Sequence, residues 1–198
     1  MDYLILVNRF EPLPQGFEHN IRFKSVRGKL FEKQAGAALE GLLQAAENEG
    51  CALEVISGYR SADYQQMLWE KEISKEMACG LDYQAAKEKC ALTLALPGES
   101  EHQTGLAVDF GKKGDDDVSY DFIRSKQSVW LERSAHRFGF ILRYPRLKEH
   151  ITGIAFEPWH YRYVGVESAC IIRENGICLE EFLDFYQDKY LDSTNKGI

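Results

Sequence analysis

The sequence lacks a long apolar run. A membrane-spanning helix needs about 20 consecutive apolar residues, whereas the apolar run near the start covers only residues 3–7. No basic residue precedes that run, as a secretory signal peptide would require. If Met1 is the natural start, we therefore expect no membrane span and a cytoplasmic protein.

Cysteines are few and form no recognisable pairs. There are five, and no two have the close CxxC spacing of thiolate zinc sites or redox motifs. An odd number also argues against a disulfide framework. We interpret them as small apolar side chains in a reducing compartment. The alternative, a cysteine nucleophile, is disfavoured because no histidine-bearing motif surrounds any of them.

Basic residues are in deficit, with 24 Lys and Arg against 31 Asp and Glu, for a net charge of -7. This balance disfavours binding to nucleic acid or to an anionic membrane. It remains compatible with a small anionic substrate, because a pocket can be locally positive. A length of 198 residues with 44% hydrophobic content predicts a single globular domain over 1–198. The sequence indicates no oligomeric state.

Helical and strand patterns are mixed without regular alternation, which predicts an α+β fold rather than a doubly wound sheet. Hydrophobic spacing and end signals define the expected elements. The helices are predicted over 31–49, 61–78, 83–90, 121–137 and 179–191, and the strands over 52–57, 106–110, 140–144 and the residues after Pro158. The acidic segment 114–117 predicts a surface loop.

A first polar cluster lies within an apolar segment, SEHQTGLAVD at 100–109. In the predicted strand, Asp109 lies on the face opposite Val108, and an unpaired carboxylate would be costly to bury there. A turn through Gly105 can bring His102 back beside Asp109. These two side chains would form half of a metal site.

A second polar cluster is Glu157-Pro158-Trp159-His160. With His160 as third ligand, two imidazoles and one carboxylate leave the fourth zinc position open for water, as in catalytic sites. Pro158 favours an extended Glu157, whose carboxylate could act as general base on that water. A buried His–Asp pair is also a common structural arrangement. The spacing alone leaves both interpretations open.

Three motifs in this order resemble the LAS-type zinc peptidases, which include D,D-carboxypeptidases and D,D-dipeptidases of the VanY, VanX and VanXY kinds. They are GYRS at 58–61, the SxHxxGxAxD pattern at 100–109 and the ExWH pattern at 157–160. The segments FGFILRYP and TGIAFEPWHYRYVG are similar to VanXY and VanY proteins. The resemblance covers approximately residues 55–165.

The resemblance implies an α+β fold in which a small antiparallel sheet carries the zinc site, flanked by helices, as in hedgehog-type and D,D-peptidase domains. It implies Zn²⁺ as the cofactor, with His102, Asp109 and His160 as ligands and Glu157 as the catalytic base. It also places Arg60 near the scissile carbonyl, where a fixed guanidinium can stabilise an oxyanion.

Two of these roles have plain structural alternatives. Arg60 could instead form a salt bridge that holds the turn at Gly58. Ser100 and Gln65 are expected to position the substrate, although Gln65 could equally be a helix-surface residue.

The implied reaction is hydrolysis of the D-Ala-D-Ala bond in cytoplasmic peptidoglycan precursors, which removes the target of vancomycin. The resemblance leaves open a preference for the dipeptide or for a longer peptide. Two alternatives are a lytic endopeptidase of the cell wall and an inactive zinc-stabilised binding module. The first lacks a basic wall-binding segment. The second is disfavoured because a structural zinc site needs neither Glu157 nor Arg60.

Overall fold

A four-stranded antiparallel sheet forms the centre of the computed structural model, which describes residues 2–185. The strand order is β3-β4-β6-β5, and a separate two-stranded hairpin pairs β1 with β2. The strands are β1 (Phe23–Val26), β2 (Lys29–Glu32), β3 (Leu53–Ser57), β4 (Ala107–Lys112), β5 (Phe140–Leu142) and β6 (His160–Tyr163). Antiparallel sheets mixed with helices confirm the predicted α+β class.

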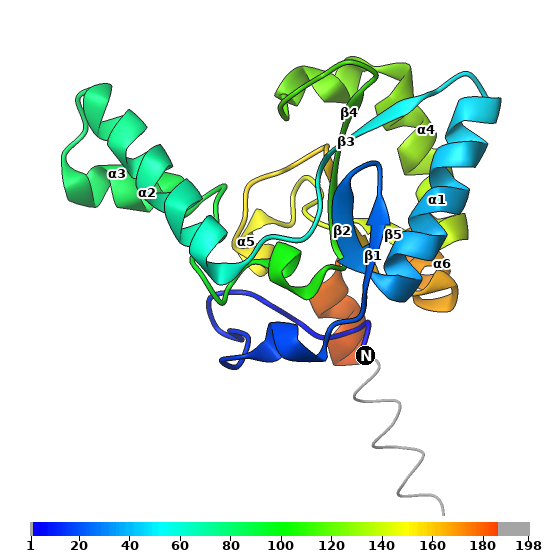
Figure 1. The fold of residues 1–198 in the computed structure, drawn as a ribbon, viewed down its shortest axis with the longest axis horizontal. Helices are drawn as coiled ribbons and strands as arrows, with labels where there is room; N and C mark the ends of the chain where they lie inside the picture. Colours follow the sequence, from blue (N-terminus) through cyan, green and yellow to red (C-terminus); the bar gives the residue numbers. More distant parts are fainter. Residues whose placement is uncertain (1, 186–198) are drawn as a thin grey trace, which may run out of the picture.

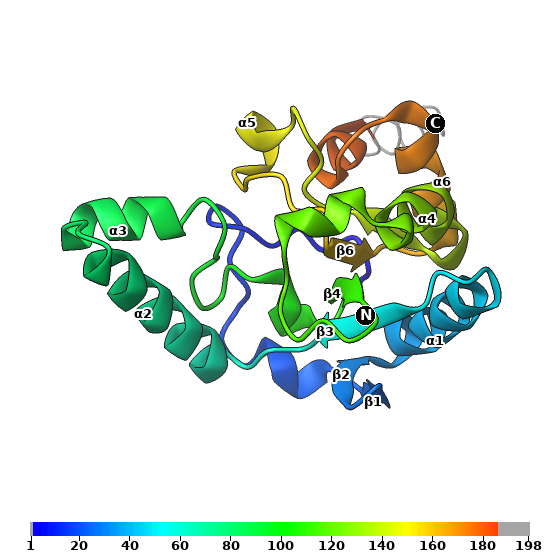
Figure 2. The same ribbon diagram turned by 90° about the horizontal axis from the view of Figure 1, so that it is seen from above.

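Helices surround the sheet unevenly. They are α1 (Lys33–Asn48), α2 (Ala62–Ala78), α3 (Tyr83–Cys90), α4 (Lys126–Ser134), α5 (Glu149–Thr152) and α6 (Val166–Asn175). In Figures 1 and 2, α1, α4 and α6 gather on one side of the fold, and the α2–α3 pair projects from the other. Within residues 2–185, no helix has the length and apolar character needed to cross a membrane.

The main core lies between α1 and one face of the central sheet. Leu39 and Leu42 of α1 belong to the same buried cluster as Val108 and Phe110 of β4 and Tyr161 of β6. Side chains alternate between the two faces of a strand. The residues that lie between these apolar positions therefore face away from the core, and this second face carries the polar site.

The helix predicted over 121–137 is broken in the structure. It is divided into a 3-10 helix (Tyr120–Arg124), α4 and a second 3-10 helix (Ala135–Phe138). Ser125 is extended, with φ -83° and ψ 152°, and its hydroxyl accepts a hydrogen bond from the Ser128 amide. A serine that caps a new helix stops the preceding one, because its backbone leaves the helical region.

Several elements lie outside the sequence predictions. The β1–β2 hairpin turns through Arg27 and Gly28, both with positive φ, as a type I′ hairpin turn requires. Helix α6 was also not predicted. The C-terminal helix predicted over 179–191 is helical over 179–185, and its last six positions lie outside the described residues.

Candidate metal centre

Strand pairing brings Asp109 and His160 together. The two residues are direct partners in the antiparallel register of β4 and β6, where opposed side chains lie close on one face. The Nδ1 atom of His160 lies 2.9 Å from Oδ1 of Asp109. The predicted convergence of these residues, which are distant in sequence, therefore depends on a single strand register.

A tight turn brings His102 to the same place. His102 belongs to a 3-10 helix (Glu101–Thr104) that ends at Gly105, where φ is +71°. A Cβ atom there would also lie 2.7 Å from the Glu32 amide nitrogen, so only glycine fits. The turn sets His102 Nε2 3.1 Å from Asp109 Oδ2, as the sequence predicted.

A backbone carbonyl orients the His102 ring. Its Nδ1 lies 2.6 Å from the Gly58 carbonyl oxygen. A carbonyl can only accept, so Nδ1 donates and Nε2 is left as the lone-pair nitrogen facing Asp109. Burial is the main cause that lowers the pKa of His102 to about 4. The imidazole is therefore neutral at pH 7, the form that binds metals.

The three side chains fit a metal ion. His102, Asp109 and His160 are all buried, and one ligand atom from each lies within 4.8 Å of the others. The two imidazole rings are nearly perpendicular, with centroids 5.0 Å apart. Two nitrogen donors and one carboxylate are a ligand set that zinc commonly uses in catalytic sites.

Glu157 lies beside these three groups. Its Oε2 atom is 3.8 Å from His160 Nδ1, and the residue is only 6% exposed. Burial, reinforced by the charge of Asp109, raises the pKa of Glu157 to about 8, against the opposing effect of His160 and Arg60. A cation bound nearby would favour the charged carboxylate. Glu157 is therefore a carboxyl group suited to exchanging a proton close to neutral pH.

Arg60 reaches the same group of side chains. Its Nη2 lies 2.6 Å from Asp109 Oδ2, and its Nε donates to the Ser57 hydroxyl. Its backbone amide donates to the His102 carbonyl at 3.1 Å. The arginine does form a salt bridge, as the structural alternative supposed, but its partner is Asp109 itself. Its guanidinium thus lies at the site rather than at a remote turn.

Ser100 and Gln65 are both buried. Ser100 precedes the 3-10 helix that carries His102 and is 5% exposed. Gln65 is 0% exposed, so it is not a helix-surface residue. Its Nε2 donates to the Ala95 carbonyl, and within the described part of the chain its Oε1 is buried with no hydrogen-bond partner.

A buried ion cluster that was not predicted from the sequence lies behind the ligands. Glu101 contacts both Arg143 and Arg162 at 2.7 Å, and none of the three side chains is exposed. A signal was present, because Arg143 lies in the largely apolar segment FILRY and Arg162 lies between two tyrosines in a predicted strand. A buried charge requires an opposite charge or hydrogen bonds, so these arginines indicated a buried acidic partner.

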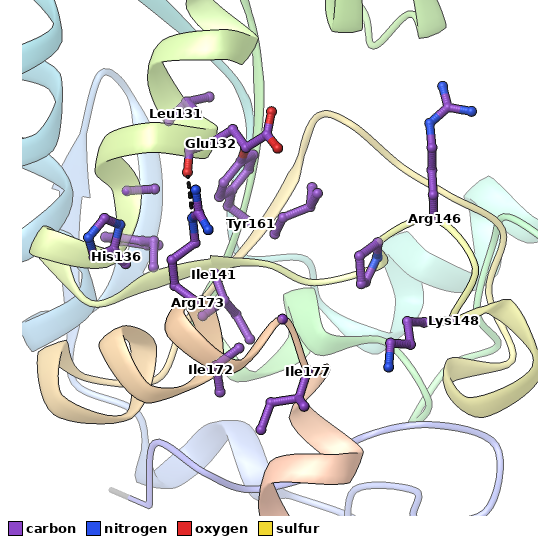
Figure 3. Close-up of a pocket in the computed structure, with 15 residues that line it drawn as sticks. Leu131, Glu132, His136, Ile141, Arg146, Lys148, Tyr161, Ile172, Arg173 and Ile177 are labelled. Carbon is purple, nitrogen blue, oxygen red and sulfur yellow. Dashed lines mark hydrogen bonds between the residues drawn. The ribbon is translucent and has the colours of Figure 1, made fainter.

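A cavity of about 210 Å³ lies elsewhere, beside β5 (Figure 3). It is lined by Tyr161, Ile172 and Arg173, among others, and the Arg173 Nε donates to the Glu132 carbonyl at 3.1 Å. Tyr161 follows His160 in β6, so the two side chains point to opposite faces of the sheet. None of the site residues named above lines this cavity.

We expect Gly58→Ala to weaken both the fold and metal binding. The new Cβ would lie 2.6 Å from the Leu30 carbonyl oxygen and 2.7 Å from the Phe31 ring. Relief of this overlap must move the backbone whose carbonyl holds His102. The expected loss is about 1–3 kcal/mol in the free energy of unfolding, measured by urea denaturation, with a weaker zinc affinity in chelator competition. Gly41→Ala, with only ordinary contacts to Phe138, is the matched control and should lose neither.

Two imidazoles, a carboxylate and an adjacent second carboxylate in one buried cluster are typical of a mononuclear metallohydrolase site. Comparison with known proteins identifies the family to which this chain belongs. The model of the VanY family, described as D-alanyl-D-alanine carboxypeptidase, matches residues 28–166. The chain therefore belongs to this family, as the three motifs indicated.

Two curated relatives extend the match. A D-alanyl-D-alanine carboxypeptidase of Enterococcus faecalis is 40% identical over 181 residues, which are 91% of this chain and 65% of that relative. The chain thus spans just under two thirds of that relative's length. The bifunctional D-Ala-D-Ala dipeptidase and carboxypeptidase VanXYC of Enterococcus gallinarum is 36% identical over 191 residues, 93% of this chain and 95% of VanXYC.

Solved structures share the fold. The D,D-pentapeptidase VanY from a VanB-type cassette, in complex with Zn(II), has a TM-score of 0.83 at 38% identity, covering 92% of this chain and 99% of that one. VanYB in complex with D-alanine-D-alanine has a TM-score of 0.82 at 39% identity, covering 92% and 97%. The LD-carboxypeptidase LdcB has a TM-score of 0.76 at 35% identity, covering 90% and 84%.

Proposed function

We propose that this chain is a zinc-dependent D-alanyl-D-alanine carboxypeptidase that removes the terminal D-alanine from peptidoglycan precursors. The observation that carries the proposal is the convergence of His102, Asp109 and His160, with the Glu157 carboxylate beside them. The Zn(II) in the related VanY structure and the D-alanine-D-alanine bound to VanYB support the choice of metal and substrate.

The chemistry follows from the residues at the site. A zinc ion held by the three ligands would polarise the scissile carbonyl and lower the pKa of a bound water. Glu157 accepts a proton from the attacking water, whose oxygen adds to the carbonyl carbon. Arg60 stabilises the resulting oxyanion, because its guanidinium stays charged. Glu157 then returns the proton to the nitrogen, the C–N bond breaks, and D-alanine leaves with a free amine.

Ser100 and Gln65 are proposed to position the substrate. The buried Oε1 of Gln65 is an acceptor that needs a donor, and an amide or ammonium of a peptide could supply one. Ser100 stands two residues before His102, at the start of the 3-10 helix that carries this ligand. The proposed substrates are cytoplasmic: the free dipeptide or the nucleotide-linked muramyl pentapeptide. The similarity to VanXYC, named as both dipeptidase and carboxypeptidase, supports either length.

A second candidate is an L,D-carboxypeptidase. The structural similarity to the LD-carboxypeptidase LdcB favours it. The same ligands, base and arginine would serve, because both reactions release a terminal D-alanine by hydrolysis. The two candidates differ in the chirality of the residue before the cleaved bond.

A comparison of three peptides tests the proposal. We expect D-alanine release from a pentapeptide ending in D-Ala-D-Ala to have a kcat/KM at least about tenfold above that for a tetrapeptide ending in L-residue–D-Ala; tenfold corresponds to about 1.4 kcal/mol. The free D-Ala-D-Ala dipeptide measures dipeptidase activity in the same assay, with D-amino acid oxidase as detector. Release confined to the tetrapeptide would replace the first candidate by the second. Release of soluble fragments from cross-linked wall would instead support a lytic endopeptidase.

A further inference from the structure

A group of buried charges lies directly behind His160. It consists of Glu101, Arg143 and Arg162, whose side chains are 0% exposed, and Glu180, whose side chain is 11% exposed. None of these residues takes part in the reaction described above. Ionic groups are rarely buried without a structural or functional reason, so the contacts within the group indicate its role.

The two oxygens of Glu101 have different surroundings. Oε1 contacts both guanidinium groups, Arg143 Nε at 2.7 Å and Arg162 Nη1 at 2.7 Å. Oε2 is buried and, within residues 2–185, has no hydrogen-bond partner. It lies 3.7 Å from Nε2 of His160. The arginines thus hold one oxygen and leave the other facing the imidazole.

His160 presents the complementary arrangement. Its Nδ1 faces the ligand set, 2.9 Å from Asp109 Oδ1. Its Nε2 is buried and likewise lacks a hydrogen-bond partner among the described residues. A histidine that binds a metal through one nitrogen carries its proton on the other and donates it to an acceptor behind the site. Glu101 Oε2 is the carboxylate oxygen in that position, 3.7 Å from Nε2.

We infer that Glu101 is a positioning residue that accepts the Nε2 proton of His160 and so holds Nδ1 toward the metal. This inference rests on the proposed function, in which His160 is a zinc ligand. His102 receives the equivalent support from the neutral carbonyl of Gly58. The two imidazoles are therefore oriented by acceptors of different charge, and the carboxylate supports His160.

The surrounding contacts hold Glu101 in this orientation. Arg143 forms two further hydrogen bonds with Glu180, at 2.7 and 2.9 Å. Arg162 donates through Nη2 to the carbonyls of Tyr3 and Ile5. The segments near both ends of the described chain thereby supply acceptors for the two guanidiniums. With these donors satisfied, both arginines can remain fixed on Oε1 and keep Oε2 directed at His160.

Two isosteric variants separate this role from a general effect of the ion cluster. Glu101→Gln and Glu180→Gln each remove one carboxylate charge from Arg143, but only Glu101 faces His160. We expect Glu101→Gln to weaken zinc affinity by about 10–100-fold in chelator competition and to change the visible absorption spectrum of the Co²⁺-substituted protein. Glu180→Gln keeps one acceptor oxygen for Arg143 and leaves Glu101 in place, so it should lower the melting temperature while zinc affinity and the Co²⁺ spectrum stay close to those of the wild type. Unchanged zinc affinity in Glu101→Gln, or an equal loss in both variants, would overturn the inference.

A measurement on the wild type covers the case in which Glu101→Gln does not fold. In the zinc-loaded protein, nitrogen-15 NMR should show His160 protonated on Nε2, with a proton that exchanges slowly with solvent. Protonation on Nδ1, or a rapidly exchanging proton, would refute the positioning role. A wild type that binds no zinc would defeat the proposed function itself. A zinc-binding wild type matched by Glu101→Gln would defeat only the role of Glu101.

Discussion

Replacement of Glu157 by alanine is expected to reduce the turnover of a D-Ala-D-Ala peptide by about 10²–10⁴-fold, the range for loss of a general base. Zinc should remain bound, because all three ligands are intact. The large loss of turnover is expected because Glu157 Oε2 lies beside the ligand set, 3.8 Å from His160 Nδ1. Steady-state kcat/KM and the zinc-to-protein ratio of the same preparation measure the two effects separately.

The matched control for this variant is Glu149→Ala. Glu149 is an exposed carboxylate on α5, and its loss should change neither kcat/KM nor zinc content. Retained hydrolysis in Glu157→Ala would remove this residue from the role of base. Loss of zinc together with activity would instead make Glu157 a ligand and would require another group to accept the proton.

The second large effect is expected for His102→Ala, which should lower the zinc content well below that of the wild type. A structural zinc site of four ligands is worth about 10–16 kcal/mol. Loss of one ligand at about 3 kcal/mol corresponds to an affinity lower by at least about 100-fold. Activity should disappear with the metal. Metal analysis after dialysis and chelator competition measure the change.

His150→Ala serves as the control for His102→Ala. His150 is exposed on α5, so its replacement should leave zinc content and activity as in the wild type. An unchanged zinc-to-protein ratio in His102→Ala would exclude His102 from the ligand set. If the variant is unstable, refolding in the presence of zinc and comparison of unfolding midpoints with and without the metal show whether the metal still binds.

Local signals predicted much of the secondary structure. The helix expected after Ser61 begins there, with the serine hydroxyl accepting from the Tyr64 amide, and the helix expected over 83–90 has those bounds. The single helix over 121–137 was wrong because Ser125 looks the same in sequence whether it lies inside a helix or caps the next one. Strands β1 and β2 were not predicted because each has only four residues. Short, half-exposed strands show little alternation of apolar and polar side chains.

The residues of the candidate site were easier to predict from the sequence than the helices and strands around them. The proposed ligand and base positions fall within two short motifs, and the structure brings His102, Asp109, His160 and Glu157 together. The acidic partner of Arg143 was not identified. Its position depends on which of many carboxylates packs against the strands, and spacing carries no information about that choice.

The sequence alone determined which donor types are present at the site, namely imidazoles and carboxylates. It also determined the part of the site that is local in the chain, where the turn at Gly105 returns His102 to Asp109 within seven residues. The tertiary structure decided what depends on long-range packing. His160 lies 51 positions from Asp109, and their meeting requires the β4–β6 register, because a shift of one residue would turn His160 to the opposite face. The orientation of Glu101, which is next to His102 in the sequence, likewise depends on long-range packing, because Arg162 of β6 and Arg143, directly after β5, both contact its Oε1.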